Sequence, residues 1–159
     1  MNLFPIAGER LDPTSWHLEP ADVLFDFDGP EIFTAHLPSL GLALVYLCVS
    51  DKVQRRERYL VVAIEAATVD ALAASRVSVR EVLDQPFCWV VDATFSGDVE
   101  AVHRVAREAL PDDALPRPGV AIDGRSLTSP DGLWAELQRL PRRSMALQLR
   151  DPTWKAEAA

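Results

Sequence analysis

Two aspartates, Asp26 and Asp28, are the residues whose type and spacing come closest to a catalytic pair. They stand one residue apart at the end of an apolar run, Val23 to Phe27, and Gly29-Pro30 follows. Two carboxylates that converge in a cleft with a third acidic group can hold a divalent cation for hydrolysis. The same residues also suit a strand end followed by a turn. In that structural interpretation Asp28 starts the turn and Asp26 faces solvent.

The stretch from Leu24 to Gly29 resembles the first motif of haloacid-dehalogenase-like phosphotransferases. The resemblance implies that Asp26 is the nucleophile, that Asp28 is the general acid/base, and that a magnesium ion lies beside them. Other features of that family are missing. Pro30 replaces a small β-branched residue, a strand is expected where a helix should follow, and no lysine stands at the usual place before the acidic pair Asp112-Asp113. A Mg²⁺-dependent phosphohydrolase using Asp26 and Asp28 is therefore the alternative function.

The composition is that of an acidic protein of one ordinary globular domain. The chain has 159 residues, of which 48% are hydrophobic, and a formal net charge of −8. Such a surface repels nucleic-acid phosphates, so direct nucleic-acid binding is not expected. No apolar run is long enough to span a membrane, and the first residues lack the features of a secretory signal. Cys48 and Cys88 each lie in an apolar run, which favours buried free thiols in a cytoplasmic protein without a bound metal or other cofactor.

One basic cluster stands out against this acidic background, formed by Lys52, Arg55, Arg56 and Arg58. It lies between two apolar runs rich in β-forming residues, Leu42 to Val49 and Tyr59 to Ile64. Their connection is too short for a crossover helix, so the runs are predicted to pair as an antiparallel hairpin with the cluster at its tip. The tip is either a solvated turn or a contact site for an acidic partner.

The order of the elements predicts an α+β fold. We expect an N-terminal arm with little regular structure (1–22), a single domain (23–150) and a tail (151–159). The domain is expected to hold a bent antiparallel sheet of about five strands, with a small open barrel as the alternative, and helices on one side. Besides the hairpin, strands are expected over 23–27, 31–37, 87–95, 120–122 and 144–150, and helices after Thr68, after Ser78, over 99–110 and after Ser129.

Several short motifs occur in order: Asp28-Gly29-Pro30-Glu31-Ile32-Phe33, Tyr46-Leu47, Ser78-Val79-Arg80 and Leu115-Pro116-Arg117-Pro118-Gly119. Together they resemble a family of small bacterial proteins classed as a domain of unknown function. The resemblance covers about residues 23 to 122 and implies no established activity. Within it, Ser78 and Glu81 have the spacing of a capping box, and Arg80 lies inside this predicted helix cap. An arginine there either pairs internally with a carboxylate such as Asp26 or Asp28, or presents its guanidinium to a partner.

These patterns favour a non-enzymatic binding, regulatory or accessory subunit of a bacterial system that acts by protein contact. Small proteins of this kind suggest a role in defence or toxin–immunity. The candidate partner-binding residues are the four of the basic cluster and Arg80. A second alternative is an acidic mimic of nucleic acid, although the acidic residues are dispersed among arginines and do not form dense rows.

Overall fold

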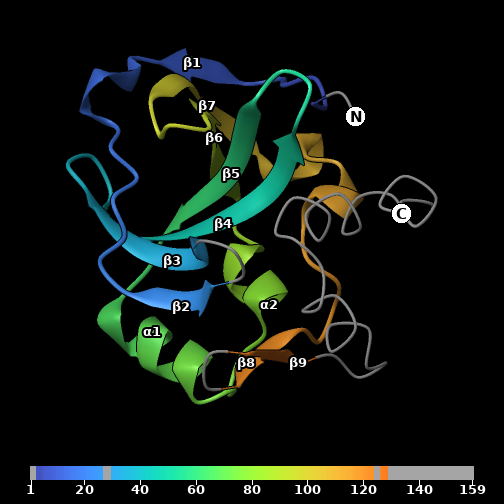
Figure 1. Cartoon of the computed structure of the whole chain (residues 1–159). Helices are drawn as coiled ribbons and strands as arrows, with labels where there is room; N and C mark the ends of the chain where they lie inside the picture. Colours follow the sequence, from blue (N-terminus) through green and yellow to red (C-terminus); the bar gives the residue numbers. More distant parts are fainter. Residues whose placement is uncertain (1–2, 27–29, 124–125, 129–159) are drawn as a thin grey trace.

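A computed structural model describes residues 3–26, 30–123 and 126–128 of the chain. Its main feature is one seven-stranded sheet in the order β1-β7-β6-β5-β4-β3-β2, in which all neighbours are antiparallel (Figure 1). A two-stranded sheet, β8-β9, accompanies it. The strands are β1 (Glu9–Leu11), β2 (Val23–Asp26), β3 (Pro30–Leu37), β4 (Gly41–Asp51), β5 (Arg56–Ala63), β6 (Phe87–Thr94), β7 (Val99–Ala106), β8 (Ala121–Asp123) and β9 (Ser126–Thr128).

The predicted hairpin is confirmed as β4 and β5, which pair from Ala43↔Ala63 to Asp51↔Arg56. Both strands are rich in Val, Leu and Tyr, whose side chains pack well on a pleated surface. The register shifts between Leu47 and Val49, and again between Asp92 and Ala93 in the β6–β7 pair. Such bulges bend a strand and increase its twist, in keeping with the expected bent sheet.

Both faces of the sheet are buried, and each has its own apolar cluster. On β4 the side chains alternate between the clusters, with Leu44 and Tyr46 in the first and Val45 and Leu47 in the second. The short helices α1 (Ala66–Ala73) and α2 (Val79–Leu83) contribute buried residues to the first cluster only, which confirms that the helices lie on one side. Trp16, from the N-terminal segment, is buried in the second cluster.

The sheet is larger than the five strands expected, and the N-terminal segment explains part of the difference. The arm predicted to be irregular supplies β1, which pairs with β7, and a 3-10 turn, η1 (Pro13–Ser15). Gly8 precedes β1 because a Cβ there would collide with the backbone carbonyl of Arg104. The outer strands β1 and β2 do not pair with each other, so the sheet is not a closed barrel.

The helix predicted over 99–110 is wrong, because most of that segment is strand β7. The apolar residues at Val99, Val102 and Ala106 match helical spacing. In the structure Val102 belongs to the second cluster and Val105 to the first. Each face of β7 buries one of these valines, and the two are three residues apart, so the strand shows no clean two-residue alternation and its pattern imitates a helix. Three β-branched valines and the turn at 96–98 were the signals that favoured a strand.

The two short helices expected after Thr68 and Ser78 are present, but Thr68 lies inside α1, which begins at Ala66 after Glu65. Ser78 caps α2 in the predicted capping box: its hydroxyl accepts from the amide of Glu81, and the Glu81 carboxylate accepts from the amide of Ser78. The short strand expected at 120–122 is present as β8. The expected helix after Ser129, the strand over 144–150 and the tail lie outside the described residues. Within the described part of the chain, no helix has the length and apolar character needed to cross a membrane.

Candidate functional site

Of the acidic pair, only Asp26 lies within the described residues. Asp26 is the last residue of β2 and is exposed, and Asp28 lies outside the described residues. Among the residues that the structure describes, no group of three or more His, Cys, Asp and Glu side chains is placed to hold a metal ion. The described part of the chain therefore supplies no third acidic ligand beside Asp26 for the metal site that the enzymatic alternative requires.

The basic cluster lies as expected at the end of the β4–β5 hairpin, at the top of Figure 1. We call residues 52–56 the hairpin tip. All five are exposed, and Val53 is the most exposed of the large apolar residues in the described ranges, at 88%. The tip thus presents an aliphatic side chain among three cationic ones, Lys52, Arg55 and Arg56.

The backbone of the hairpin tip is held in one conformation by a buried carboxylate. Asp51 is only 2% exposed, and its Oδ1 accepts hydrogen bonds from the amides of Val53 (2.9 Å) and Gln54 (3.0 Å). Arg55 has a φ of 56°, in the left-handed region that non-glycine residues rarely occupy. Such a conformation persists where surrounding contacts hold it.

Those contacts come from the β6–β7 turn, which lies beside the hairpin tip. The amide of Phe95 donates to the carbonyl oxygen of Arg55 (3.2 Å), and the Arg55 guanidinium lies 5.7 Å from the centroid of the Phe95 ring. Nearby, Arg56 forms an ion pair with Glu100 at 2.9 Å, in which both side chains are exposed. The two turns therefore form one surface from segments about forty residues apart in the chain.

A hollow of about 310 Å³ lies between these two turns. The hairpin tip lines it with Gln54, Arg55 and Arg56, and the other side is lined by Thr94, Phe95, Ser96 and Glu100. The hydroxyls of Thr94 and Ser96 lie 2.8 Å apart. We call this feature the tip hollow. It combines two guanidinium groups, two hydroxyls, an aromatic ring and the carboxylate of Glu100, and the guanidinium groups are suited to binding a small anion.

Arg58 differs from the rest of the basic cluster because it is buried. Its side chain is 5% exposed and forms a bidentate ion pair with Asp92 on β6, at 2.6 and 2.8 Å. The guanidinium also donates to the backbone carbonyl oxygen of Phe4 and lies 4.5 Å from the centroid of the Phe4 ring. Arg58 thus holds the N-terminal segment against the sheet, and we leave it out of the contact surface proposed below.

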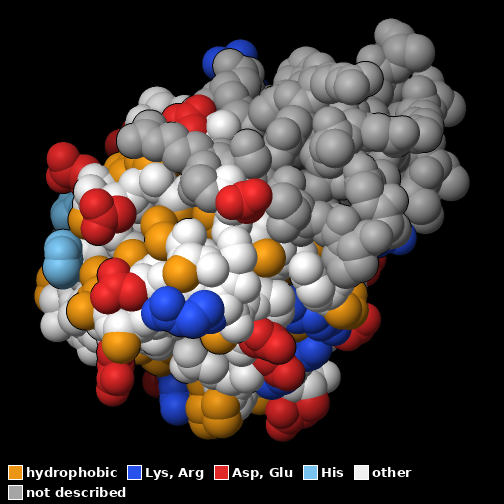
Figure 2. Space-filling view, turned by 90° about the horizontal axis from the view of Figure 1, so that it is seen from below, with side chains coloured by type: hydrophobic (Ala, Val, Ile, Leu, Met, Phe, Trp, Pro, Cys, Tyr) orange, Lys and Arg blue, Asp and Glu red, His pale blue; other side chains and the backbone are white. Residues whose placement is uncertain are grey.

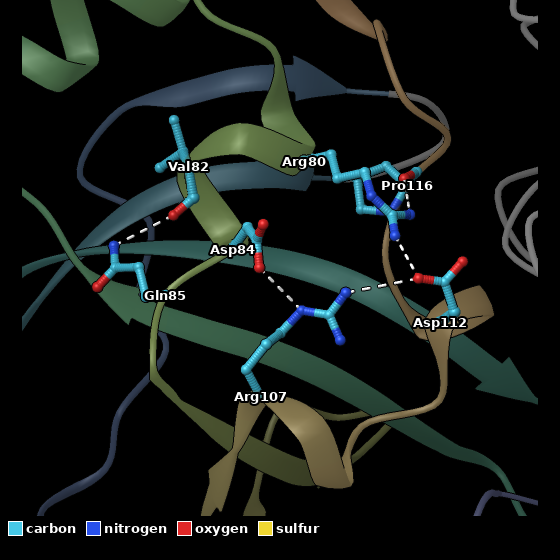
Figure 3. A network of polar contacts seen from close by, with 7 residues as sticks. All are labelled: Arg80, Val82, Asp84, Gln85, Arg107, Asp112 and Pro116. Carbon is cyan, nitrogen blue, oxygen red and sulfur yellow. Dashed lines mark hydrogen bonds and ion pairs between the residues drawn. The ribbon is translucent and has the colours of Figure 1, made fainter.

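Arg80 has internal partners in the network drawn in Figure 3. It forms an ion pair with Asp112 and donates to the carbonyl oxygen of Pro116 (3.0 Å). Arg107 joins the same carboxylate at 3.5 Å and pairs with Asp84 at 3.0 Å. Two arginines and two aspartates therefore connect α2 with the 3-10 turns η2 (Arg107–Ala109) and η3 (Asp112–Ala114). This arrangement supports a structural role for Arg80.

The network gives a pH-dependent prediction for Asp112. The Arg80 guanidinium, and to a lesser degree Arg107, holds the pKa of the Asp112 carboxyl below its ordinary value of 3.8. A lowered folded-state pKa means that the contribution of this pair is present above pH 3.8 and is lost as the pH falls below it. NMR titration of the carboxyl carbon should show the pKa of Asp112 rising toward 3.8 in Arg80→Gln and rising less in Arg107→Gln. An Arg76→Gln control should leave it unchanged, and equal values in all four proteins would contradict the assignment.

The charges elsewhere on the described surface are mixed. On the face drawn in Figure 2, acidic side chains stand apart from one another and basic side chains lie among them. The described residues on this face form no dense row of carboxylates of the kind that a mimic of nucleic acid presents to a basic groove.

Sequence reasoning found the cations of the hairpin tip but missed the β6–β7 side of the tip hollow. Phe95 and Ser96 lie in the turn between β6 and β7 and Glu100 lies on β7, and the pairing of β5 with β6 brings this side to the hairpin tip. The turn signal Ser96-Gly97-Asp98 was visible in the sequence, but its neighbour in space was not.

Comparison of the chain with models of known protein families, with curated proteins and with solved structures finds no significant match. No activity can therefore be inferred for the site from a related protein, and the resemblance to a bacterial domain of unknown function stays a prediction.

Proposed function

We propose that this chain is a non-enzymatic binding, regulatory or accessory subunit that acts in the bacterial cytoplasm by contact with another protein. The observation that carries the proposal is the hairpin tip, an exposed set of cations around Val53 on a protein of net charge −8. Arginine is enriched at protein interfaces, where its guanidinium binds carboxylates and packs on aromatic rings. A role in a defence or toxin–immunity system is the biological setting that we propose.

Preorganisation supports a contact role for the hairpin tip. The buried Asp51 carboxylate and the Phe95 amide fix the tip backbone before any partner arrives. A loop that is already ordered loses less conformational entropy when it binds, so more of the contact energy remains as affinity. The backbone of the hairpin tip is thus fixed by hydrogen bonds, while its side chains are exposed to solvent.

The test is purification of the tagged full-length chain from its host, with identification of proteins that remain bound. We expect a partner that is recovered with the wild type and is lost with Arg55→Glu/Arg56→Glu. Association should also weaken as salt rises, because exposed charges are screened. The double variant should keep its free energy of unfolding within about 0.5 kcal/mol, since exposed substitutions usually change stability little. Recovery of the chain alone, or equal recovery of the partner with both proteins, would contradict the proposal.

The same preparation tests the enzymatic alternative. Magnesium-dependent turnover of a generic phosphate ester that is abolished in Asp26→Asn would replace the binding role with a phosphohydrolase. We expect no such turnover. A preparation of the Asp26→Asn variant made in parallel distinguishes activity of this chain from that of a contaminating phosphatase.

A further inference from the structure

We propose that the tip hollow binds a carboxylate from an acidic segment of the protein partner, with Arg55 as the anchor and Glu100 as an internal competitor. This inference rests on the proposed function and specifies the chemistry of the partner. Its elements are Arg55 beside the Phe95 ring, the exposed Arg56–Glu100 pair and the hydroxyls that line the hollow.

Arg55 is positioned but has no ion-pair partner within the described residues. Its contact with the Phe95 ring holds the guanidinium in place through the π face, which leaves its N–H donors available. A guanidinium with free donors matches the two oxygens of a carboxylate. Arg55 is therefore placed to form charge-assisted hydrogen bonds with a carboxylate of the partner.

Arg56 already shows which ligand this surface accepts. It binds the carboxylate of Glu100 at 2.9 Å, and the side chains of Arg56 and Glu100 are 46% and 36% exposed. Exposed pairs of this kind are weak, so a carboxylate from a partner can take the place of Glu100. Glu100 thus occupies in the free protein a position that the partner's carboxylate takes in the complex.

The charges around the tip hollow favour a carboxylate over a phosphate. Glu100 lines the hollow, and Asp98 lies in the same turn, where its Oδ2 accepts from Ser96 (3.3 Å). Two nearby acidic groups repel a dianion more strongly than a monoanion. The hydroxyls of Thr94 and Ser96 are already hydrogen-bonded to each other and to Asp98, so the guanidinium groups of Arg55 and Arg56 are the donors for an incoming carboxylate.

The experiment is an NMR titration of the ¹⁵N-labelled full-length chain with hexaglutamate at low salt, with hexaglutamine and inorganic phosphate as comparison probes. Hexaglutamate should shift the amides of Val53, Arg55, Phe95 and Ser96 in a saturable way, and hexaglutamine should not. Arg55→Ala should weaken the dissociation constant at least about fivefold, as expected for a charged hydrogen-bonded contact. Glu100→Gln should strengthen it about two- to fivefold, the range of an exposed ion pair.

Two matched controls separate local from general charge effects. Arg76→Ala and Glu108→Gln remove one exposed charge of each sign away from the tip hollow, and they should leave the dissociation constant nearly unchanged. Equal affinity in Arg55→Ala and wild type, or a Glu108→Gln gain equal to that of Glu100→Gln, would overturn the inference. Tighter binding of phosphate than of hexaglutamate would overturn the preference for carboxylate.

The titration and the host purification fail independently. If a partner is recovered in a manner that depends on the hairpin tip while hexaglutamate does not bind, the carboxylate inference is wrong and the proposed function stands. If hexaglutamate binds the tip hollow while no partner is recovered from the host, the site exists and the proposed function is contradicted.

Discussion

Asp92→Asn is expected to lower the free energy of unfolding by about 3–5 kcal/mol, the largest effect of any single substitution considered for this chain. The substitution removes the negative charge that faces Arg58, whose side chain is 5% exposed. A buried guanidinium without its counter-ion keeps its desolvation cost and loses the attraction that offset it. Urea unfolding followed by circular dichroism measures the change.

The chain offers a matched comparison on the same strand. Arg56 and Arg58 both lie on β5 and both form an ion pair, but only the Arg56 pair with Glu100 is exposed. Glu100→Gln should therefore change the free energy of unfolding by less than about 1 kcal/mol. A double variant, Arg58→Met/Asp92→Leu, should recover much of the loss because it leaves no unpaired buried charge. Similar losses in Asp92→Asn and Glu100→Gln would show that burial does not determine the strength of the Arg58 pair.

The second large effect concerns stability in alkaline solution. Burial raises the pKa of the Cys88 thiol from 9.0 to about 12. The folded-state pKa lies above the unfolded value, so the contribution of the neutral thiol is complete below pH 9 and is lost as the pH rises toward 12. Between these values the loss amounts to about 1.4 kcal/mol per pH unit. Cys88→Ala should lose stability less steeply over this range.

The measurement is urea unfolding of wild type and Cys88→Ala at pH 8, 9, 10 and 11. Other groups titrate in both proteins, so the difference between the two curves isolates Cys88. We expect any advantage of the wild type at pH 8 to shrink by about 1.4 kcal/mol per unit above pH 9. The folded wild type should also resist thiol reagents, because the thiolate is the reactive form and Cys88 is fully buried. A constant difference across the four pH values would contradict the raised pKa.

Local and short-range patterns were sufficient to predict part of this fold. The β4–β5 hairpin followed from two apolar runs joined by a short polar connection, and the capping box of α2 followed from Ser78 and Glu81 alone. In both cases the interacting residues are close in the sequence. The helix predicted over 99–110 failed because β7 buries one valine on each face, Val102 and Val105, and therefore lacks the alternation that marks a strand with one buried face.

In the candidate site, too, only the features that depend on residues close in the sequence could be predicted. Lys52, Arg55 and Arg56 could be placed at the hairpin tip because the strands on either side were recognisable. The burial of Arg58 could not, since it depends on Asp92 and Phe4, which are remote in the sequence. The same holds for Arg80, whose ion-pair partner Asp112 lies beyond two intervening strands. Charge alone does not reveal which cations face solvent.

The position of β1 also determines when the sheet can be completed. Every strand from β2 to β7 pairs with its neighbour in the chain, so these hairpins can form in sequence order. β1 is the exception, because its register joins Glu9–Leu11 to Val102–Arg104 near the opposite end of the described chain. Contacts between distant residues carry the largest loop-closure cost and slow folding. During synthesis β1 leaves the ribosome before the other strands of this sheet but cannot pair until β7 has formed, and β7 keeps an open edge until then.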